Sequence, residues 1–168
     1  MRKKKTINGE GVDFGDSFKF LGIVISNGLS WVSHRSSIVK RCHVRLHFLK
    51  QLKYFGRNQT IIIQFYRSVM ESIVCFGITV YFAGMTSGEK SELEYLVRHA
   101  SRRVGRDLPS VASLYSIRLR KRACKIIDDP SYPTNHLFDL LPSGGRYRAI
   151  KARTSHFRLR FRDAILAL

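Results

Sequence analysis

The stretch "QTIIIQFYRSVMESIVCFGITVYF", residues 59–82, decides the fold because it is long, apolar and helical in period. The side chains predicted to face inward recur at helical spacing: Ile62, Phe65, Tyr66, Val69, Ile73 and Phe76. Its β-branched residues would also allow a strand, but its length favours a helix, which Asn58 is expected to cap. The longest uncharged run, residues 72–88, holds about 13 continuous apolar residues, too few to cross a bilayer, so a buried helix is predicted.

Helical periods also flank this segment. One helix is expected from Ser33 to a stop at Gly56, with apolar positions at Ile38, Cys42, Leu46, Leu49 and Leu52. Thr86 and Glu89 form a capping box for another, whose apolar stripe is Leu93, Leu96, Val97, Ala100 and Val104. Pro109-Ser110 precedes a helix over 111–129 that Pro130 ends, and "NHLFDLL" (135–141) is expected to form a short last helix.

The N-terminal segment has the pattern of β-structure. Asn8-Gly9 lies between short β-prone runs and predicts a two-residue hairpin turn. Residues 18–25 read as one strand that is apolar on both faces and therefore expects cover on both. One face would carry Phe18, Phe20 and Val24, and the other Leu21, Ile23 and Ile25. Gly22 in its middle suggests a bulge or the close approach of another backbone.

The chain is therefore expected to be mainly α. A short β-hairpin unit over residues 1–30 would precede a bundle of four to five helices. The last segment, 143–168, would be a basic tail, irregular or helical, because it has little apolar rhythm.

Charge is the strongest indication of function. Thirty Lys and Arg residues against 12 Asp and Glu give a formal net charge of +18, spread over the whole chain. Such a field favours a polyanion, with nucleic acid as the first candidate, because +18 is well beyond what solubility asks of a small domain. A merely solvated basic surface is the alternative.

The cysteines and the N-terminus indicate the compartment. Cys42, Cys75 and Cys124 are isolated, so they predict neither a disulfide framework nor a zinc site, and a reducing environment is expected. "MRKKKTING" has no apolar run after its basic start, so no signal peptide is expected. We expect an intracellular protein, nuclear or cytoplasmic, without a membrane segment.

Catalytic and cofactor motifs are absent from the sequence. It has no HExxH motif and no phosphate-binding GxxxxGK loop, and "GEGVDFG" precedes a strand rather than the helix such a loop requires. His43 and His47 lie four residues apart and could share a metal, but no carboxylate is near, and a solvated face is favoured. Asp128-Asp129 is better explained as a solvated helix end. We therefore expect no enzyme activity, cofactor or metal.

Basic clusters follow the predicted helices and fill the tail. Seven bases lie between residues 146 and 162 with aromatic residues among them, an arrangement that suits phosphate oxygens and unpaired bases. Across the chain, the candidate nucleic-acid-binding bases are Lys50, Lys53, Arg57, Arg102, Arg103, Arg120, Lys121, Arg146, Arg148, Lys151, Arg153, Arg158 and Arg160.

The order of several segments resembles the C-terminal part of the reverse transcriptase of non-LTR (LINE-type) retrotransposons. These segments are "FKFLGI", "LSW", "RLHFLKQLKYFG", "FYRSVMESIVCFGIT", "HASRRVGRDLPS" and the stretch from "LYSIRLRKRACKIIDDP" to "KARTSHFR". The resemblance implies a primer-grip-like hairpin at the palm edge over 1–30, a thumb-like bundle over 31–85 and a post-thumb region over 86–142. In the grip, Lys19, Phe20, Leu21 and Gly22 would hold the primer end. The family's YxDD-type catalytic strand-turn-strand is missing, so polymerase activity is not expected.

Residues of about 18–66 are also similar to the segment known as the N-terminal domain of AlkB homologue 8. The chain has no HxD iron motif, so dioxygenase or methyltransferase chemistry is not expected to accompany this similarity.

Three functions stay open on the sequence. The first is a catalytically incomplete reverse-transcriptase fragment that binds RNA or DNA without sequence specificity and in a salt-sensitive manner. The second is a stand-alone helical nucleic-acid-binding or adaptor module with the tail as its docking arm. The third is an interaction protein whose charge is incidental.

Overall fold

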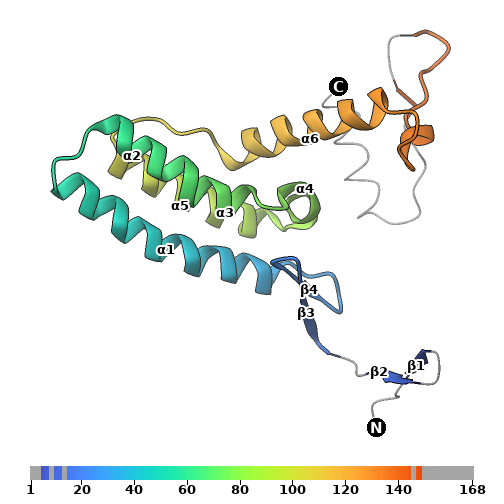
Figure 1. Ribbon diagram of the computed structural model, residues 1–168, viewed down its shortest axis with the longest axis horizontal. Helices are drawn as coiled ribbons and strands as arrows, with labels where there is room; N and C mark the ends of the chain where they lie inside the picture. Colours follow the sequence, from blue (N-terminus) through green and yellow to red (C-terminus); the bar gives the residue numbers. More distant parts are fainter. Residues whose placement is uncertain (1–4, 8–9, 13–14, 145–146, 149–168) are drawn as a thin grey trace.

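The computed structural model describes residues 5–7, 10–12, 15–144 and 147–148, and it is mainly α-helical, as the sequence predicts (Figure 1). Two short β-hairpins come first. The helical elements follow in the order α1 (Val32–Tyr54), α2 (Gln59–Phe65), η1 (Tyr66–Glu71), α3 (Ser72–Cys75), α4 (Ile78–Tyr81), η2 (Phe82–Gly84), α5 (Ser87–Val104), α6 (Val111–Asp128) and η3 (Asn135–Leu137).

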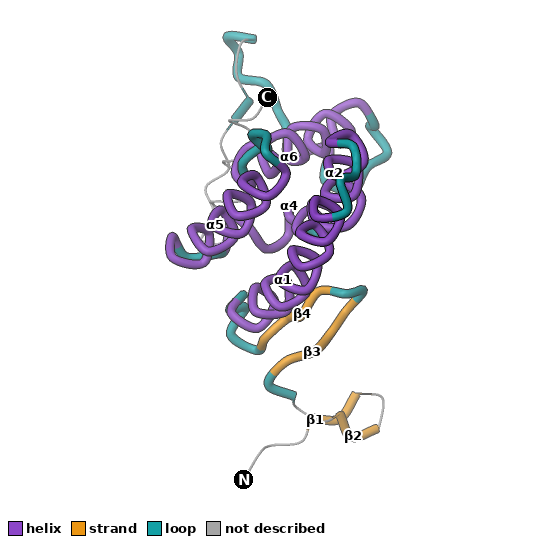
Figure 2. Tube along the Cα trace, turned by 90° about the vertical axis from the view of Figure 1, so that its left-hand side faces the viewer, coloured by secondary structure: helices purple, strands orange, loops and turns teal. Residues whose placement is uncertain are grey.

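The helices form one bundle around one hydrophobic core. Figure 2 looks along the helices: α1 lies next to the strands, α2 and α5 pack on it, and α6 lies on the far side. The core extends without interruption from Trp31, before α1, to Ala123 in α6. Helices from both halves of the chain therefore share one interior.

The long helices α1, α5 and α6 confirm the predicted periods. Four of the five apolar positions predicted for α1 are buried, and the fifth, Leu52, packs partly against the core. All five predicted apolar positions of α5 are buried. Asn58, Thr86 and Ser110 accept backbone N–H groups as N-caps, and Thr86 and Glu89 complete a capping box.

The apolar segment that follows Asn58 is not one regular helix. Residues 66–71 form a π-helical turn, which fits an extra residue into the helix and shifts the face that follows by about one position. The helix ends at Cys75, and Gly77 adopts a left-handed φ of 65° before α4 begins. Ile62, Tyr66 and Ile73 are buried as predicted, but Phe76 is 52% exposed, so the inward prediction for Phe76 is wrong.

The N-terminal hairpin is as predicted. Strands β1 (Lys5–Ile7) and β2 (Glu10–Val12) pair antiparallel, with Ile7 opposite Glu10 across the two-residue connection.

The second β-segment differs from the prediction. Residues 18–25 do not form one strand with a bulge; β3 (Ser17–Phe20) and β4 (Ile23–Ser26) form a hairpin. Leu21 (φ 45°) and Gly22 (φ 84°) make its turn, and two successive positive φ values are typical of a type I′ turn. The chain reversal places Phe18 opposite Ile25 and Phe20 opposite Ile23, so these four side chains share one face, contrary to the predicted division.

The predicted fifth helix is reduced to the 3-10 turn η3. Pro142 disfavours helical φ and ψ at Leu141, and the segment is too short to stabilise an isolated helix. Asn135 instead donates its side-chain amide to the carbonyls of Ile126 and Ile127 at the end of α6. The segment closes the end of α6 rather than extending the bundle.

Candidate nucleic-acid interface

The sequence-predicted binding residues do not converge on one site. Lys19, Phe20, Leu21 and Gly22 lie on the β3–β4 hairpin. Lys50, Lys53, Arg57, Arg102 and Arg103 lie on or directly after α1 and α5, while Arg120 and Lys121 lie on α6. From the tail, Arg148 is described and exposed, whereas Arg146, Lys151, Arg153, Arg158 and Arg160 lie outside the described residues.

The C-terminal ends of α1 and α5 meet at the same end of the bundle, opposite the hairpins (Figure 1). The side-chain amide of Gln59, at the start of α2, donates to the carbonyl of Gly105 directly after α5, at 3.4 Å. The packing of α1 against α5 therefore brings together basic residues that lie about 50 positions apart in the sequence. We call the residues at this end the bundle-end cluster: Lys50, Lys53, Tyr54, Phe55, Arg57, Arg102 and Arg106.

Arg103 differs from its neighbours in this region. One of its guanidinium nitrogens donates to the carbonyl of Leu46 in α1, at 2.6 Å, and the contact is partly buried. Arg103 therefore ties α5 to α1 and offers less of its guanidinium to a ligand than the exposed Arg102 does. For this reason it is left out of the bundle-end cluster.

Two exposed aromatic residues stand among these bases. Tyr54 is 81% exposed and Phe55 is 67% exposed, and their rings lie edge to face with centroids 5.6 Å apart. Exposed aromatic faces beside cations are typical of surfaces on which unpaired bases stack. The sequence prediction missed both residues, although "KYFG" (53–56) placed them at a helix end where the apolar period stops.

The β3–β4 hairpin presents a different surface. Phe18, Phe20 and Leu21 are all more than half exposed, so the predicted cover on both faces is wrong: β3 is exposed along its length, and only β4 is half-buried. There, β4 packs against α1, and Ile23 contacts the core. A Cβ on Gly22 would lie 3.2 Å from the ring of Phe76, so a side chain approaches this turn glycine, not the predicted backbone, and there is no bulge.

A buried histidine joins this hairpin to the bundle. His34 is 3% exposed, and its Nδ1 accepts the backbone N–H of Val24 at 3.3 Å. Its ring meets that of Tyr81 edge to face at 4.8 Å. Burial, with a smaller contribution from Arg41, lowers the pKa of His34 below 6.5, so the imidazole is neutral when it accepts this hydrogen bond.

The described residues bring together no cluster of three metal-ligating side chains, and two of the three cysteine thiols are held protonated. Among residues 5–7, 10–12, 15–144 and 147–148, no three His, Cys, Asp or Glu side chains come together. His47 lies 3.4 Å from the amide nitrogen of Gln51, on the exposed side of α1. Burial raises the pKa of the Cys42 thiol to about 11 and also raises that of Cys75, so both stay protonated at neutral pH.

Residues Gln59–Gly84 are long and apolar enough to cross a membrane by length and composition, with a mean hydropathy of 1.5. Core helices of soluble proteins pass the same test, so this is weak support for a span. The segment contributes Ile62, Tyr66, Met70 and Ile73 to the core.

Comparison with known proteins gives a similarity for one segment of the chain. Residues 31–72 match the family described as "alkylated DNA repair protein alkB homolog 8, N-terminal". The match confirms the similarity expected from the sequence, but it begins after the β3–β4 hairpin and covers α1, α2 and η1. No curated protein matches the chain. No solved structure matches it either.

Proposed function

We propose that this chain binds RNA or DNA through its exposed basic surface and that it is the grip-and-thumb part of a LINE-type reverse transcriptase. The bundle-end cluster carries the proposal, because it combines exposed cations with the exposed rings of Tyr54 and Phe55. Cations neutralise phosphates without reading sequence, and aromatic faces accept any base. Binding is therefore expected to be independent of sequence.

The exposed hairpin fits the same proposal. The rings of Phe18 and Phe20 lie on one face of β3–β4, 6.5 Å apart, and Lys19 lies between them on the opposite face. In the reverse transcriptases that the sequence resembles, this hairpin holds the primer end. The polymerase aspartates are not in this chain, so it is proposed to bind nucleic acid without extending it.

The test is a titration of fluorescent single-stranded RNA, single-stranded DNA and an RNA–DNA duplex by fluorescence anisotropy over a series of salt concentrations. Each phosphate neutralised contributes about −0.7 to −0.9 to the slope of log affinity against log salt concentration. A steep slope on all sequences is expected. Affinity that does not change with salt would contradict electrostatic nucleic-acid binding.

The absence of polymerase activity and the role of the tail need separate tests. Extension of a primer–template by the purified chain with Mg²⁺ would contradict the proposal that the chain binds nucleic acid without extending it. Deletion of residues 143–168 distinguishes the alternative, a stand-alone module with a docking arm. The module loses most of its binding, whereas a thumb-like surface loses only a part.

A further inference from the structure

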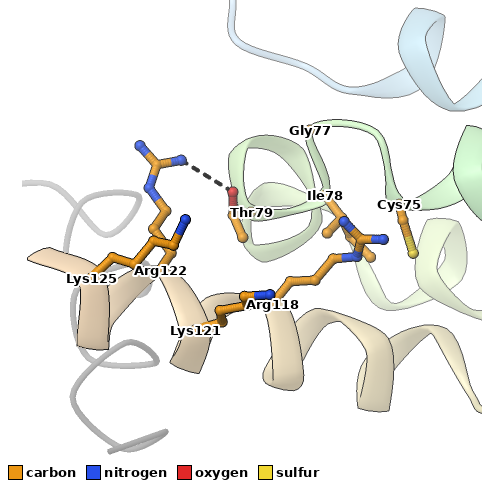
Figure 3. Close-up of a pocket in the computed structure, with 8 residues that line it drawn as sticks. All are labelled: Cys75, Gly77, Ile78, Thr79, Arg118, Lys121, Arg122 and Lys125. Carbon is orange, nitrogen blue, oxygen red and sulfur yellow. Dashed lines mark hydrogen bonds between the residues drawn. The ribbon is translucent and has the colours of Figure 1, made fainter.

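A second basic region surrounds a cavity between α4 and α6, at the other end of the bundle from the bundle-end cluster. The cavity has a volume of about 380 Å³ and is lined by Cys75, Gly77, Ile78, Thr79, Arg118, Lys121, Arg122 and Lys125 (Figure 3). Its size lies within the range of small-molecule pockets. Four of its eight lining residues are cationic, and none is acidic.

Helix geometry explains how the four cations converge. Arg118, Lys121, Arg122 and Lys125 follow the spacing i, i+3, i+4 and i+7, so they share one face of α6. Arg120 lies on the same helix but does not line the cavity. Like charges at this spacing repel one another when nothing is bound between them.

Both arginines extend toward the opposite wall, and one of them is anchored there. Arg122 donates to the hydroxyl of Thr79 at 3.3 Å. The charge of Arg118 acts on the Cys75 thiol, where it opposes the rise in pKa that burial causes. Figure 3 shows both side chains extending from α6 toward the segment 75–79. None of the four cations forms an ion pair with a carboxylate among the described residues. All four cations are exposed, and one of them, Arg122, is held by a hydrogen bond across the cavity.

We propose that this α4–α6 cavity binds a phosphate group of a nucleic-acid strand. Arginine forks contact phosphate oxygens in two places at once, and the lysine ammonium groups and the Thr79 hydroxyl supply further donors. The proposal rests on the proposed nucleic-acid binding for the source of the phosphate. A 5′-terminal phosphate carries more charge than an internal phosphodiester and suits four cations better.

The first experiment measures the thermal stability of the full chain with inorganic pyrophosphate against chloride at equal ionic strength. Pyrophosphate is expected to raise the melting temperature, because it removes the repulsion along α6 and binds only the folded chain. The variant Arg118→Gln/Arg122→Gln should lose this response. The control Lys40→Gln/Arg67→Gln removes two exposed charges outside the cavity and the bundle-end cluster and should keep it. An equal response in the two variants would overturn the proposal.

The second experiment compares a single-stranded oligonucleotide of about 12 nucleotides with and without a 5′-phosphate. The phosphate should strengthen binding to the wild-type chain by about tenfold and should have no effect on the cavity variant. If the 5′-phosphate has no effect but the cavity variant alone loses affinity, the site holds an internal phosphate. Equal losses in the cavity and control variants would overturn the site.

Two arrangements keep the result interpretable. If the arginine variant does not fold by circular dichroism, Lys121→Gln/Lys125→Gln removes two cations of the same cavity that hold no partner in the described part of the chain. The pyrophosphate measurement contains no nucleic acid. Failure of the wild-type chain to bind any oligonucleotide therefore contradicts the proposed function, whereas an absent pyrophosphate response contradicts the cavity.

Discussion

Ile23 in β4 packs against the backbone of Gly77, so closely that a Cβ on Gly77 would lie 2.6 Å from Cδ1 of Ile23. Gly77 also has a φ of 65°, which side chains disfavour. This contact joins the β3–β4 hairpin to the break between α3 and α4.

Gly77→Ala is therefore expected to destabilise the chain by about 1–3 kcal/mol, because it adds both backbone strain and a steric overlap. The loss should appear as a lower midpoint in urea denaturation. Gly88→Ala is the matched control, since a Cβ there meets nothing within 4 Å. Unchanged stability in Gly77→Ala would contradict the described contact.

Most of the helical fold follows from the sequence because apolar period and capping residues act locally. Thr86 with Glu89 marks the start of α5 both in the sequence prediction and in the structure. Leu93 and Ala100 are buried at the positions that the apolar period predicts. The π-helical turn and the exposure of Phe76 could not be predicted in this way. The ring of Phe76 lies against Gly22, which is more than 50 residues earlier in the chain, and no local period reports such a contact.

The candidate site was predictable only as a list of bases. Sequence spacing cannot tell that Arg103 is held by the carbonyl of Leu46 or that Arg102 remains exposed, because both depend on how α5 packs against α1. The exposure of Tyr54 and Phe55 likewise depends on how the other helices pack at the C-terminal end of α1. Hydrophobic residues at a helix end are otherwise expected to cover the core.

The lowered pKa of His34 is expected to make the stability of the folded chain depend on pH. Its folded-state pKa lies below the unfolded value of 6.5, so the unfolded chain binds the proton more readily and the folded state loses stability as pH falls below 6.5. Thermal melts at pH 7.5 and 5.5 should show a smaller shift in His34→Gln than in the wild type. His99→Gln is the necessary comparison, because the pKa of His99 is also lowered. An unchanged shift in His34→Gln would contradict the lowered pKa of His34.

Tyr54 and Phe55 are expected to contribute to binding but little to stability. Replacing both with Ser should weaken single-stranded RNA binding by about tenfold or more, since each stacked base contributes roughly 1–3 kcal/mol. Anisotropy titration at fixed salt measures the loss. Tyr95→Ser is the control, because Tyr95 is 53% exposed on α5 outside the cluster. If both changes weaken binding equally, the aromatic pair has no special role.

Variants of Arg102 and Arg103 are expected to differ in effect: one should weaken nucleic-acid binding, and the other should lower the stability of the fold. Arg102→Gln is expected to lower nucleic-acid affinity and the salt slope while the melting temperature stays unchanged. Arg103→Gln should lower the free energy of unfolding by about 1–2 kcal/mol, because the carbonyl of Leu46 loses a charged donor. Urea denaturation and anisotropy on the same preparations test both. The reverse pattern would show that Arg103 faces the ligand.

The length of α5 sets a scale for the two basic regions. Its 18 residues span roughly 27 Å, and it runs from the α4 end of the bundle to the bundle-end cluster. At 3.4 Å per step along one strand, this equals about eight base steps of a duplex. Ligands shorter than this would occupy either the bundle-end cluster or the α4–α6 cavity. Longer strands would contact both regions at once and bind more tightly, because the second contact is then intramolecular.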